Sequence, residues 1–391
     1  MRNSVAIAFI LALPVAAVDA QESASWLRSR TLANALNPRI SVLGHVIAQS
    51  GPTRAETDLA LQEVELGLQS EIDPYGRADF FIAKPHGEGV EIEEGYFTLT
   101  SLPAGLQARG GKFLASFGKL NMLHRFERPG VNSPLVLDRF LGPEGLVGTG
   151  GELARVLAPF GIFTELSYAF LQDLGEADPE AEAATATVID ANGNTATVPI
   201  HEEQAAAPRR ARDYAHVARA RAYSDLTDAA NIELGVSGAS HQPTGALHRR
   251  LLGADVTLRW RRPEQSQYRG LIWRSEMIWS RRVLPAEFDA VSGAFVDDPA
   301  RIDRRSLYSL LEFQVDRRWF VGVRADYAEQ ASARAGRAPT RALAPFVMFS
   351  PSEFQRLTAQ YDARVRPSGS TDHLAALKWT VVLGPHGAHP F

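Results

Sequence analysis

Charged side chains recur at alternate positions of otherwise apolar segments, on what would be one face of a strand. The basic ones are Arg109, Lys112, Arg219, Arg221, Arg259, Arg274, Arg324 and Arg356, and the acidic ones include Glu63 and Glu65. A ring of Arg or Lys around a water-filled passage favours anions, whereas a ring of Asp or Glu favours cations. Both signs are present, so the sequence predicts an ion-lined passage with a weak preference for anions. Salt-bridge ladders with little selectivity are the alternative interpretation.

A second group of charged residues lies in residues 118–145, a stretch without regular alternation. It contains His124, Arg125, Glu127 and Asp138, together with three prolines that stiffen the backbone. Mixed charges on a stiff loop inside a passage could set a transverse field and a size limit. We therefore predict a loop that folds inward as a constriction. An outward surface loop with solvated charges is the alternative.

Residues with catalytic or metal-binding potential are otherwise sparse. The chain has no cysteine, which excludes disulfides, thiolate metal sites and cysteine catalysis. It has no Gly-x-Ser-x-Gly nucleophile motif either. His386 and His389 have a spacing that could suit a metal pair, but Pro385 and Pro390 oppose the helix that would align them. We predict no metal site, no cofactor and no enzymatic activity.

The elements that would position the charged residues are strands. Leu252, Val256 and Trp260 alternate with Asp255 and Arg259, which is the period of a strand with one apolar face. Such segments are long enough to cross a membrane at a tilt, and their apolar faces often end in Trp or Tyr, as in an interfacial girdle. The sequence therefore predicts an all-β fold, a transmembrane antiparallel β-barrel of about 16 strands, within a range of 14–18. The segments lie near residues 39–49, 60–72, 78–84, 89–100, 105–117, 146–158, 160–171, 213–223, 231–241, 249–261, 268–282, 305–315, 317–328, 342–350, 354–366 and 372–384.

The connections between these segments alternate between tight turns and longer polar stretches. Short periplasmic turns and long outer loops are typical of outer-membrane barrels. An Asn-Gly pair within residues 190–194 predicts a hairpin inside the longest loop. A break in the alternation at Gly110-Gly111 predicts a β-bulge, with Phe113 and Phe117 on the outward face.

The first residues have the pattern of a secretory signal. Arg2 precedes an apolar run over residues 5–18, and small residues precede Gln21. This pattern predicts a cleaved signal peptide over residues 1–20. Residues 21–37 would then form a short periplasmic segment and residues 38–391 the barrel, so the predicted location is the bacterial outer membrane.

Several stretches resemble a porin-like family of bacterial outer-membrane proteins, whose members are variously labelled zinc-regulated TonB-dependent receptors or phosphate-selective-type porins. The resemblance is strongest over residues 37–150 and at the C-terminus. It implies a barrel in the outer membrane, and it implies no established substrate or catalytic residue. The stretches are residues 37–44 (NPRISVLG), 61–69 (LQEVELGLQ), 73–75 (DPY), 110–113 (GGKF), 117–121 (FGKLN) with His124, 142–146 (GPEGL) and 384–391 (GPHGAHPF).

Together these observations predict a porin-like channel for the passive diffusion of small polar solutes or ions. Two alternatives remain open: a ligand-specific uptake channel or receptor, for example for a metal chelate, and a structural barrel with a blocked lumen. The expected partners are outer-membrane lipid, lipopolysaccharide and the solutes, and a homotrimer follows by analogy with porins. Nucleic acid is not an expected partner, because the formal net charge of −4 provides no basic surface for it.

Overall fold

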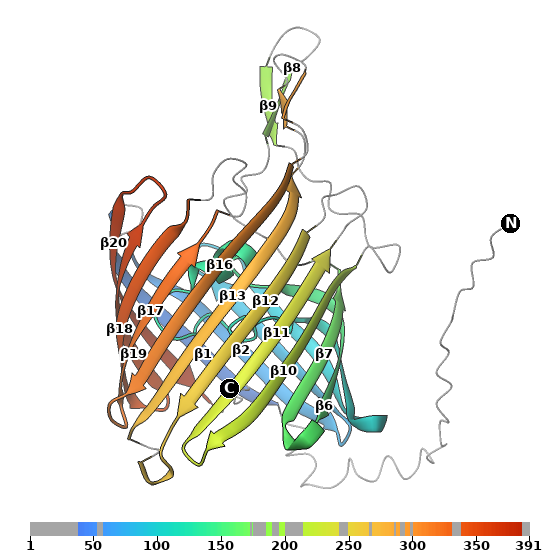
Figure 1. Ribbon diagram of the computed structural model, residues 1–391, viewed down its shortest axis with the longest axis vertical. Coiled ribbons are helices and arrows are strands. Elements are labelled where there is room, and N and C mark those ends of the chain that lie inside the picture. The colour runs from blue at the N-terminus through green and yellow to red at the C-terminus, as the bar shows by residue number, and fades with distance from the viewer. Residues whose placement is uncertain are drawn as a thin grey trace, which may run out of the picture.

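The alternating segments form strands that close into one barrel (Figure 1). In this computed structural model sixteen strands pair in chain order, each antiparallel to its neighbours, and the first pairs with the last. The predicted fold and strand number are confirmed. The structure describes residues 38–52, 58–172, 174, 185–189, 195–199, 214–241, 249–265, 268–284, 287–289, 294–297, 300–330 and 338–384.

The observed strands coincide with the segments expected from alternation, with boundaries that differ by a few residues. The hairpin predicted around the Asn-Gly pair is also present, as β8 (Thr185–Ile189) with β9 (Thr195–Pro199), and a second small hairpin joins β14 (Glu287–Asp289) to β15 (Ala294–Asp297). The barrel strands are β1 (Arg39–Ser50), β2 (Asp58–Asp73), β3 (Gly76–Pro85), β4 (Glu91–Leu102), β5 (Leu106–Leu114), β6 (Val147–Leu157), β7 (Phe163–Leu171), β10 (Ala215–Thr227), β11 (Ala230–His241), β12 (Arg249–Trp260), β13 (Gly270–Leu284), β16 (Ala300–Gln314), β17 (Trp319–Ala328), β18 (Thr340–Ser352), β19 (Gln355–Val365) and β20 (Thr371–Leu383).

The two rims of the barrel differ. Tight turns, some of them single 3-10 turns such as Pro103–Gly105 and Pro159–Gly161, join strands at the lower rim in Figure 1, and longer connections rise from the upper rim. The β8–β9 hairpin stands above the upper rim. The helix α2 (Leu135–Leu141) lies within the connection from β5 to β6. Among the described residues, no helix is long and apolar enough to cross a membrane.

The two faces of the wall separate by polarity. Large apolar side chains such as Val236, Leu252 and Trp379 are about half exposed on the outward face. Charged side chains such as Arg219 and Asp255, from the same strands, are buried on the inward face. An alternating strand has this result because successive side chains point to opposite faces. The outward face is therefore an apolar belt, and the polar atoms lie inside the ring.

The prediction of a β-bulge at Gly110-Gly111 is wrong. The register of β5 against β6 runs without a shift, and it places Gly110 opposite Gly151 and Gly111 opposite Gly150. Phe113 is fully buried on the inward face, two strand periods from Arg109, whose guanidinium lies 4.1 Å from its ring centroid. Phe117, also predicted to face outward, is fully buried beyond the end of β5. The apparent break in alternation arises because the chain turns into the lumen after Leu114.

The four facing glycines allow β5, β6 and β7 to approach closely, which gives a testable prediction. A Cβ added at Gly150 would lie 2.0 Å from the Phe170 carbonyl oxygen, whereas one added at Gly238 would meet nothing within 4 Å. Because the backbone must move, we expect Gly150→Ala to lower the free energy of unfolding by about 1–3 kcal/mol. Gly238→Ala is the matched control and should change it little. Denaturant unfolding in detergent, followed by Trp fluorescence, would measure both, and equal effects would contradict the close-approach explanation.

Candidate functional site: the loop inside the barrel

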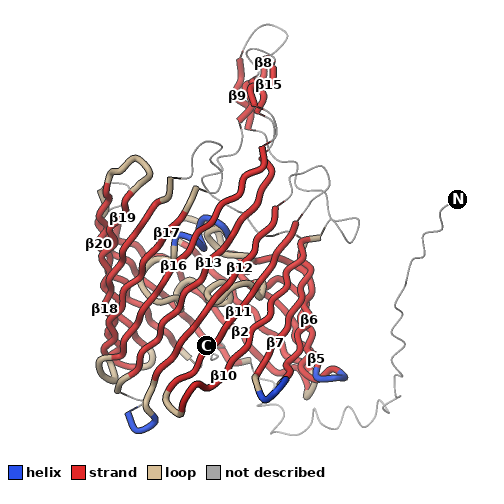
Figure 2. Tube along the Cα trace, in the orientation of Figure 1, coloured by secondary structure: helices blue, strands red, loops and turns tan. Residues whose placement is uncertain are grey.

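The connection between β5 and β6, residues 115–146, folds into the lumen, and we call it the inward loop (Figure 2). Its ends meet at the wall, where the Ala115 amide donates to the Leu146 carbonyl at 2.7 Å. Between these ends it contacts strands on every side of the ring. Its hydrogen-bond partners on the wall include Glu93, Glu94, Ser237, Glu233, Glu276, Gln360, Asp362, Asp326, Arg324, Ala328, Thr340 and Arg249. The loop therefore spans the passage at about mid-height in Figure 2.

An apolar contact holds one part of the inward loop. The helix α2 follows Pro134 and ends at Gly142, whose φ of 94° is favourable for glycine. All but two of its residues are buried, and the two exceptions are Asp138 and Arg139. Val136, Leu137, Phe140 and Leu141 pack in one cluster with apolar residues on the inner wall, and Leu135 packs separately with Ala328 and Ala342. The wall residues of this cluster that break the expected polar pattern are Leu251, Ile278, Tyr308, Leu310, Phe346 and Met348.

Buried ionic contacts hold the next part. Arg324 of β17 is 1% exposed, and it donates to the Asn132 carbonyl at 2.7 Å and to Asn132 Oδ1 at 2.8 Å. Its Nε donates to Asp326 at 2.7 Å. Near the start of the loop, Lys119 Nζ donates to Glu233 at 2.7 Å. Burial lowers the pKa of Lys119, although Glu233 opposes that shift.

His124 lies at the centre of an acidic cluster. Its Nδ1 lies 3.1 Å from Glu65 Oε2 and 3.3 Å from Glu93 Oε2, and its Nε2 lies 2.9 Å from Glu94 Oε2. Two consecutive glutamates reach the same imidazole because the β3–β4 register shifts: Phe81 pairs with Glu94 and Ile82 with Ile92, which leaves Glu93 as the extra residue of a bulge. We call Glu65, Glu93, Glu94 and His124 the His124 cluster.

Burial and neighbouring charges shift the pKa values of this part of the loop. Burial disfavours a charged His124, but its contacts with Glu65, Glu93 and Glu94 outweigh that effect and hold its pKa well above the ordinary value. Burial raises the pKa of Glu127 to about 7, in spite of the nearby His124. The raised pKa favours the charged form of His124, which bridges the loop to the acidic wall.

The predicted loop residues occupy different positions. His124 is buried against β2 and β4, whereas Arg125 is exposed. Glu127 and Asp138 are partly buried, and burial raises the pKa of Asp138, which nearby arginines oppose. His124 makes ion pairs that join the loop to the wall, as Lys119 also does. The loop thus presents Arg125 to the space that remains.

Most of the predicted lining residues share the inward face. Arg109 pairs with Glu152 at 2.8 Å, Arg221 with Glu165 at 2.8 Å, Arg219 with Asp255 at 2.6 Å, and Arg259 lies 3.8 Å from Glu233. Each remaining lining residue lies an even number of positions from a side chain that contacts the inward loop, with no register shift between them, so both point to the same face. These residues are Arg274, Arg324, Arg356, Glu63 and Glu65. These residues therefore line the inner wall, several of them as salt bridges.

Lys112 is the exception, and its assignment to the lining is a correction. It lies between Arg109 and Phe113, both inward, at the opposite parity to them. Its Nζ donates to the Ile92 carbonyl at the outer side of the neighbouring strand. Alternation without a bulge places Lys112 outward, because the slip assumed at the two glycines does not occur.

The charges inside the ring are unevenly distributed. Glu63, Glu65, Glu93 and Glu94 lie on β2 and β4. Arg219, Arg221, Arg259 and Arg274 lie on β10, β12 and β13, on the other side of the ring. These four arginines lie beside Glu165, Glu233, Asp255 and Glu276, so their charge is balanced on that side, whereas the carboxylates of β2 and β4 face His124 of the inward loop.

His386 and His389, whose spacing could suit a metal pair, lie outside the described residues. The contacts of His124 with Glu93 and Glu94 were not predicted from the sequence. The helix α2 was not predicted either, although the apolar run Leu135-Val136-Leu137 with Phe140 and Leu141 is unusual for a solvated loop. That run, together with the inward apolar residues of β16 and β18, was the sequence signal for a helix packed against the inner wall.

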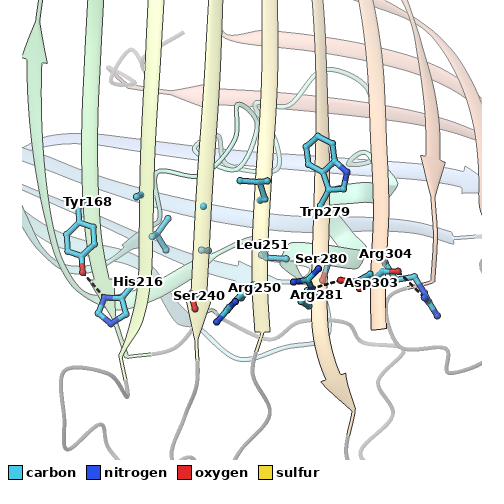
Figure 3. Close-up of a pocket in the computed structure, with 15 residues that line it drawn as sticks. Tyr168, His216, Ser240, Arg250, Leu251, Trp279, Ser280, Arg281, Asp303 and Arg304 are labelled. Atoms are coloured by element: carbon cyan, nitrogen blue, oxygen red, sulfur yellow. Dashed lines mark hydrogen bonds and ion pairs between the residues drawn. The ribbon is translucent and has the colours of Figure 1, made fainter. Parts of the chain in front are cut away.

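The outward face carries a groove over β7, β10, β11, β12, β13 and β16 (Figure 3). It encloses about 760 Å³ and has small residues such as Ala218 and Gly238 along its floor. Tyr168 and His216 lie at one end, joined by a 2.7 Å hydrogen bond, and Trp279 lies toward the other. Arg250 and Arg281 lie along one side, and Arg281 pairs with Asp303 at 2.5 Å. The groove is apolar with a charged margin.

Comparisons with known proteins bear on the fold. No family model matches the chain. A curated protein of Aquifex aeolicus, described as uncharacterized, is 25% identical over 373 residues, which cover 89% of this chain and 73% of that protein.

Solved structures with similar folds are outer-membrane proteins. OprB of Pseudomonas putida has a TM-score of 0.56 at 9% identity, over 92% of this chain and 97% of that one. An anion-selective porin from Comamonas acidovorans has a TM-score of 0.54 at 10% identity, over 89% of this chain and 100% of that one. OmpT of Vibrio cholerae, in a trimer form, has a TM-score of 0.50 at 7% identity, over 89% and 100%. At these identities the likeness shows the fold alone: this chain has the barrel architecture of porins.

Proposed function

We propose that the protein is a diffusion channel of the bacterial outer membrane, and that the inward loop sets its size limit for small polar solutes and ions. The observation that carries the proposal is the path of this loop. It leaves the wall at Ala115, reaches β11, β2, β4, β17 and β19, and returns at Leu146 inside a closed barrel. A loop held this way narrows the passage at one level, whereas a loop above the rim would not.

The outward face supports a membrane location. Backbone polar groups in hydrocarbon must be paired within the protein, and a closed barrel with an apolar belt meets that requirement. Lipid and lipopolysaccharide would surround the belt, and the arginine margin of the outward groove suits their phosphates. A cleaved signal peptide over residues 1–20 belongs to this proposal, as does a homotrimer. The proposal includes no enzymatic activity, no cofactor and no nucleic acid.

A second candidate is a structural barrel with a sealed lumen. The observation that favours it is the apolar packing of α2 against the inner wall, with Phe140, Leu141 and Tyr308 fully buried. Against it, charged side chains inside the ring keep contact with water: Arg221, Glu165 and Arg259 are 16%, 25% and 19% exposed. Water at these residues fits a restricted passage better than a sealed one.

Reconstitution separates the candidates. For the diffusion channel we expect discrete conductance steps in planar bilayers, and swelling of liposomes in small sugars that declines as the sugar grows. A ligand-specific channel would admit one solute class only, and a sealed barrel would give neither steps nor swelling. Reversal potentials across a salt gradient test the lining: we expect a weak preference for anions, because arginines recur around the ring. A cation-selective value would reject that preference.

A further inference from the structure

We propose that the His124 cluster is a binding site for a divalent transition-metal ion, coordinated by His124 Nδ1, Glu65 and Glu93, with Glu94 supporting the histidine. The donor atoms of His124, Glu65 and Glu93 lie within 4.8 Å of one another. They come from the inward loop, β2 and β4. A metal ion there would tie the loop to two strands of the wall.

The spacing of the donors suits a four-coordinate ion. Nδ1 lies 3.1 Å from Glu65 Oε2 and 3.3 Å from Glu93 Oε2. Zinc bonds to nitrogen and oxygen are about 2.0–2.2 Å, so two ligands of a tetrahedral site stand about 3.3 Å apart. Three protein ligands of this kind leave a fourth position for water. Both distances from Nδ1 are therefore close to the separation of two ligands of one ion.

One oxygen of the cluster has an ion pair but no well-formed hydrogen bond. Glu65 is 2% exposed, and its Oε2 accepts no hydrogen bond, although it lies at ion-pair distance from Nδ1. Glu65 Oε2 and Glu93 Oε2 both approach the single Nδ1 position, at 3.1 Å and 3.3 Å. A buried carboxylate oxygen without a hydrogen bond is costly. A cation in place of the Nδ1 proton would bind both oxygens at once, and the proton would leave to solvent.

The other nitrogen of His124 has the partner that metal-bound histidines usually have. Nε2 lies 2.9 Å from Glu94 Oε2. A carboxylate at this position fixes the tautomer that leaves Nδ1 free to bind metal, and it raises the basicity of the imidazole. Glu93 remains 15% exposed, which gives an ion a route from the lumen.

The charge balance also favours a divalent ion. Three carboxylates surround His124, and Glu63 and Glu127 lie near them. Arg125 and Arg128 oppose this charge, but Arg128 donates its hydrogen bonds to the Leu123 carbonyl and to Ser133. Exchange of the proton for a divalent ion reduces the net negative charge of a buried site, which lowers the cost of its burial.

The test is zinc binding by the refolded full chain in detergent, measured by isothermal titration calorimetry after removal of metals. We expect a single strong site per barrel, lost in Glu65→Gln and His124→Gln, and weakened about 10–100-fold in Glu94→Gln, because Glu94 acts through the histidine. Cobalt in place of zinc should give the intense visible absorption of a four-coordinate ion. Heat-modifiable gel mobility would verify that each variant is folded. If Glu65→Gln or His124→Gln does not fold, the affinity of Glu94→Gln still tests the proposal.

Two controls complete the design. His373→Gln removes a histidine that hydrogen-bonds Tyr361 outside the cluster, and should leave the affinity unchanged. The double variant His386→Ala/His389→Ala should also leave it unchanged. Absence of a strong site in the unaltered chain, retention of the site in folded Glu65→Gln, an unchanged affinity in folded Glu94→Gln, or loss of the site in the C-terminal double variant would each overturn the proposal. The measurement needs no conductance, so it stands or fails independently of the channel.

Discussion

Removal of the inward loop should raise the single-channel conductance several-fold and admit larger sugars. Since the Ala115 amide and the Leu146 carbonyl are hydrogen-bonded, a short Gly-Ser turn can replace residues 117–144 without a change in the wall. A sixteen-stranded barrel without an internal loop encloses a wide aqueous channel, and conductance rises with the narrowest cross-section. Planar-bilayer recordings and liposome swelling would measure the effect.

The matched control is deletion of the β8–β9 hairpin, which stands above the rim. We expect it to leave conductance unchanged. Loop removal exposes apolar wall residues such as Tyr308 and Phe346 to water, so the variant should also be less stable, and heat-modifiable gel mobility must verify that it is folded. An unchanged conductance in a folded loop-less barrel would mean that the restriction lies elsewhere.

Substitution of Arg324 should have the largest effect of any single residue on stability. Arg324→Met removes the cation beside Asp326 and both hydrogen bonds to Asn132, and leaves a fully buried carboxylate without its partner. Breaking a buried pair in this way costs about 3–5 kcal/mol. We expect a loss of that size in the free energy of unfolding, measured in denaturant, together with noisier channel currents as the loop loosens.

Arg281→Met provides the comparison at an exposed ion pair. Arg281 and Asp303 lie 2.5 Å apart, but both side chains are nearly half exposed. An exposed pair contributes about 0–1 kcal/mol, so this variant should remain close to the unaltered chain. If the two substitutions destabilised the barrel equally, burial of the Arg324 network would not be the source of its contribution.

The strands could be predicted because each carries its own signal. In β12 the apolar Leu252 and Val256 and the polar Asp255 and Arg259 alternate, and this local pattern depends only on which face meets water inside the ring. The charges of the inner wall follow from the same alternation. The position of Lys112 was predicted wrongly, because a single wrongly assumed bulge reverses the face of every side chain beyond it.

The site was harder to predict because it depends on contacts distant in sequence. Glu93 and Glu94 meet His124 only through a register shift against β3, and no local pattern in β4 reports where its partner slips. The helix α2 is short, and it is stabilised by Tyr308, Phe346 and other wall residues rather than by its own propensity. That the segment is a stiff charged loop could be predicted, but its anchors could not.

The closure of the ring determines how the molecule can be made. Val42 of β1 lies opposite Leu383 of β20, and Ser50 lies opposite Ala375, so the seam joins the earliest and latest strands to leave the ribosome. Until β20 exists, β1 has an open edge whose amide and carbonyl groups have no partners, and hydrocarbon does not tolerate such an edge. Translation and membrane integration must therefore be separate events, with the unfolded polypeptide kept from aggregating in between.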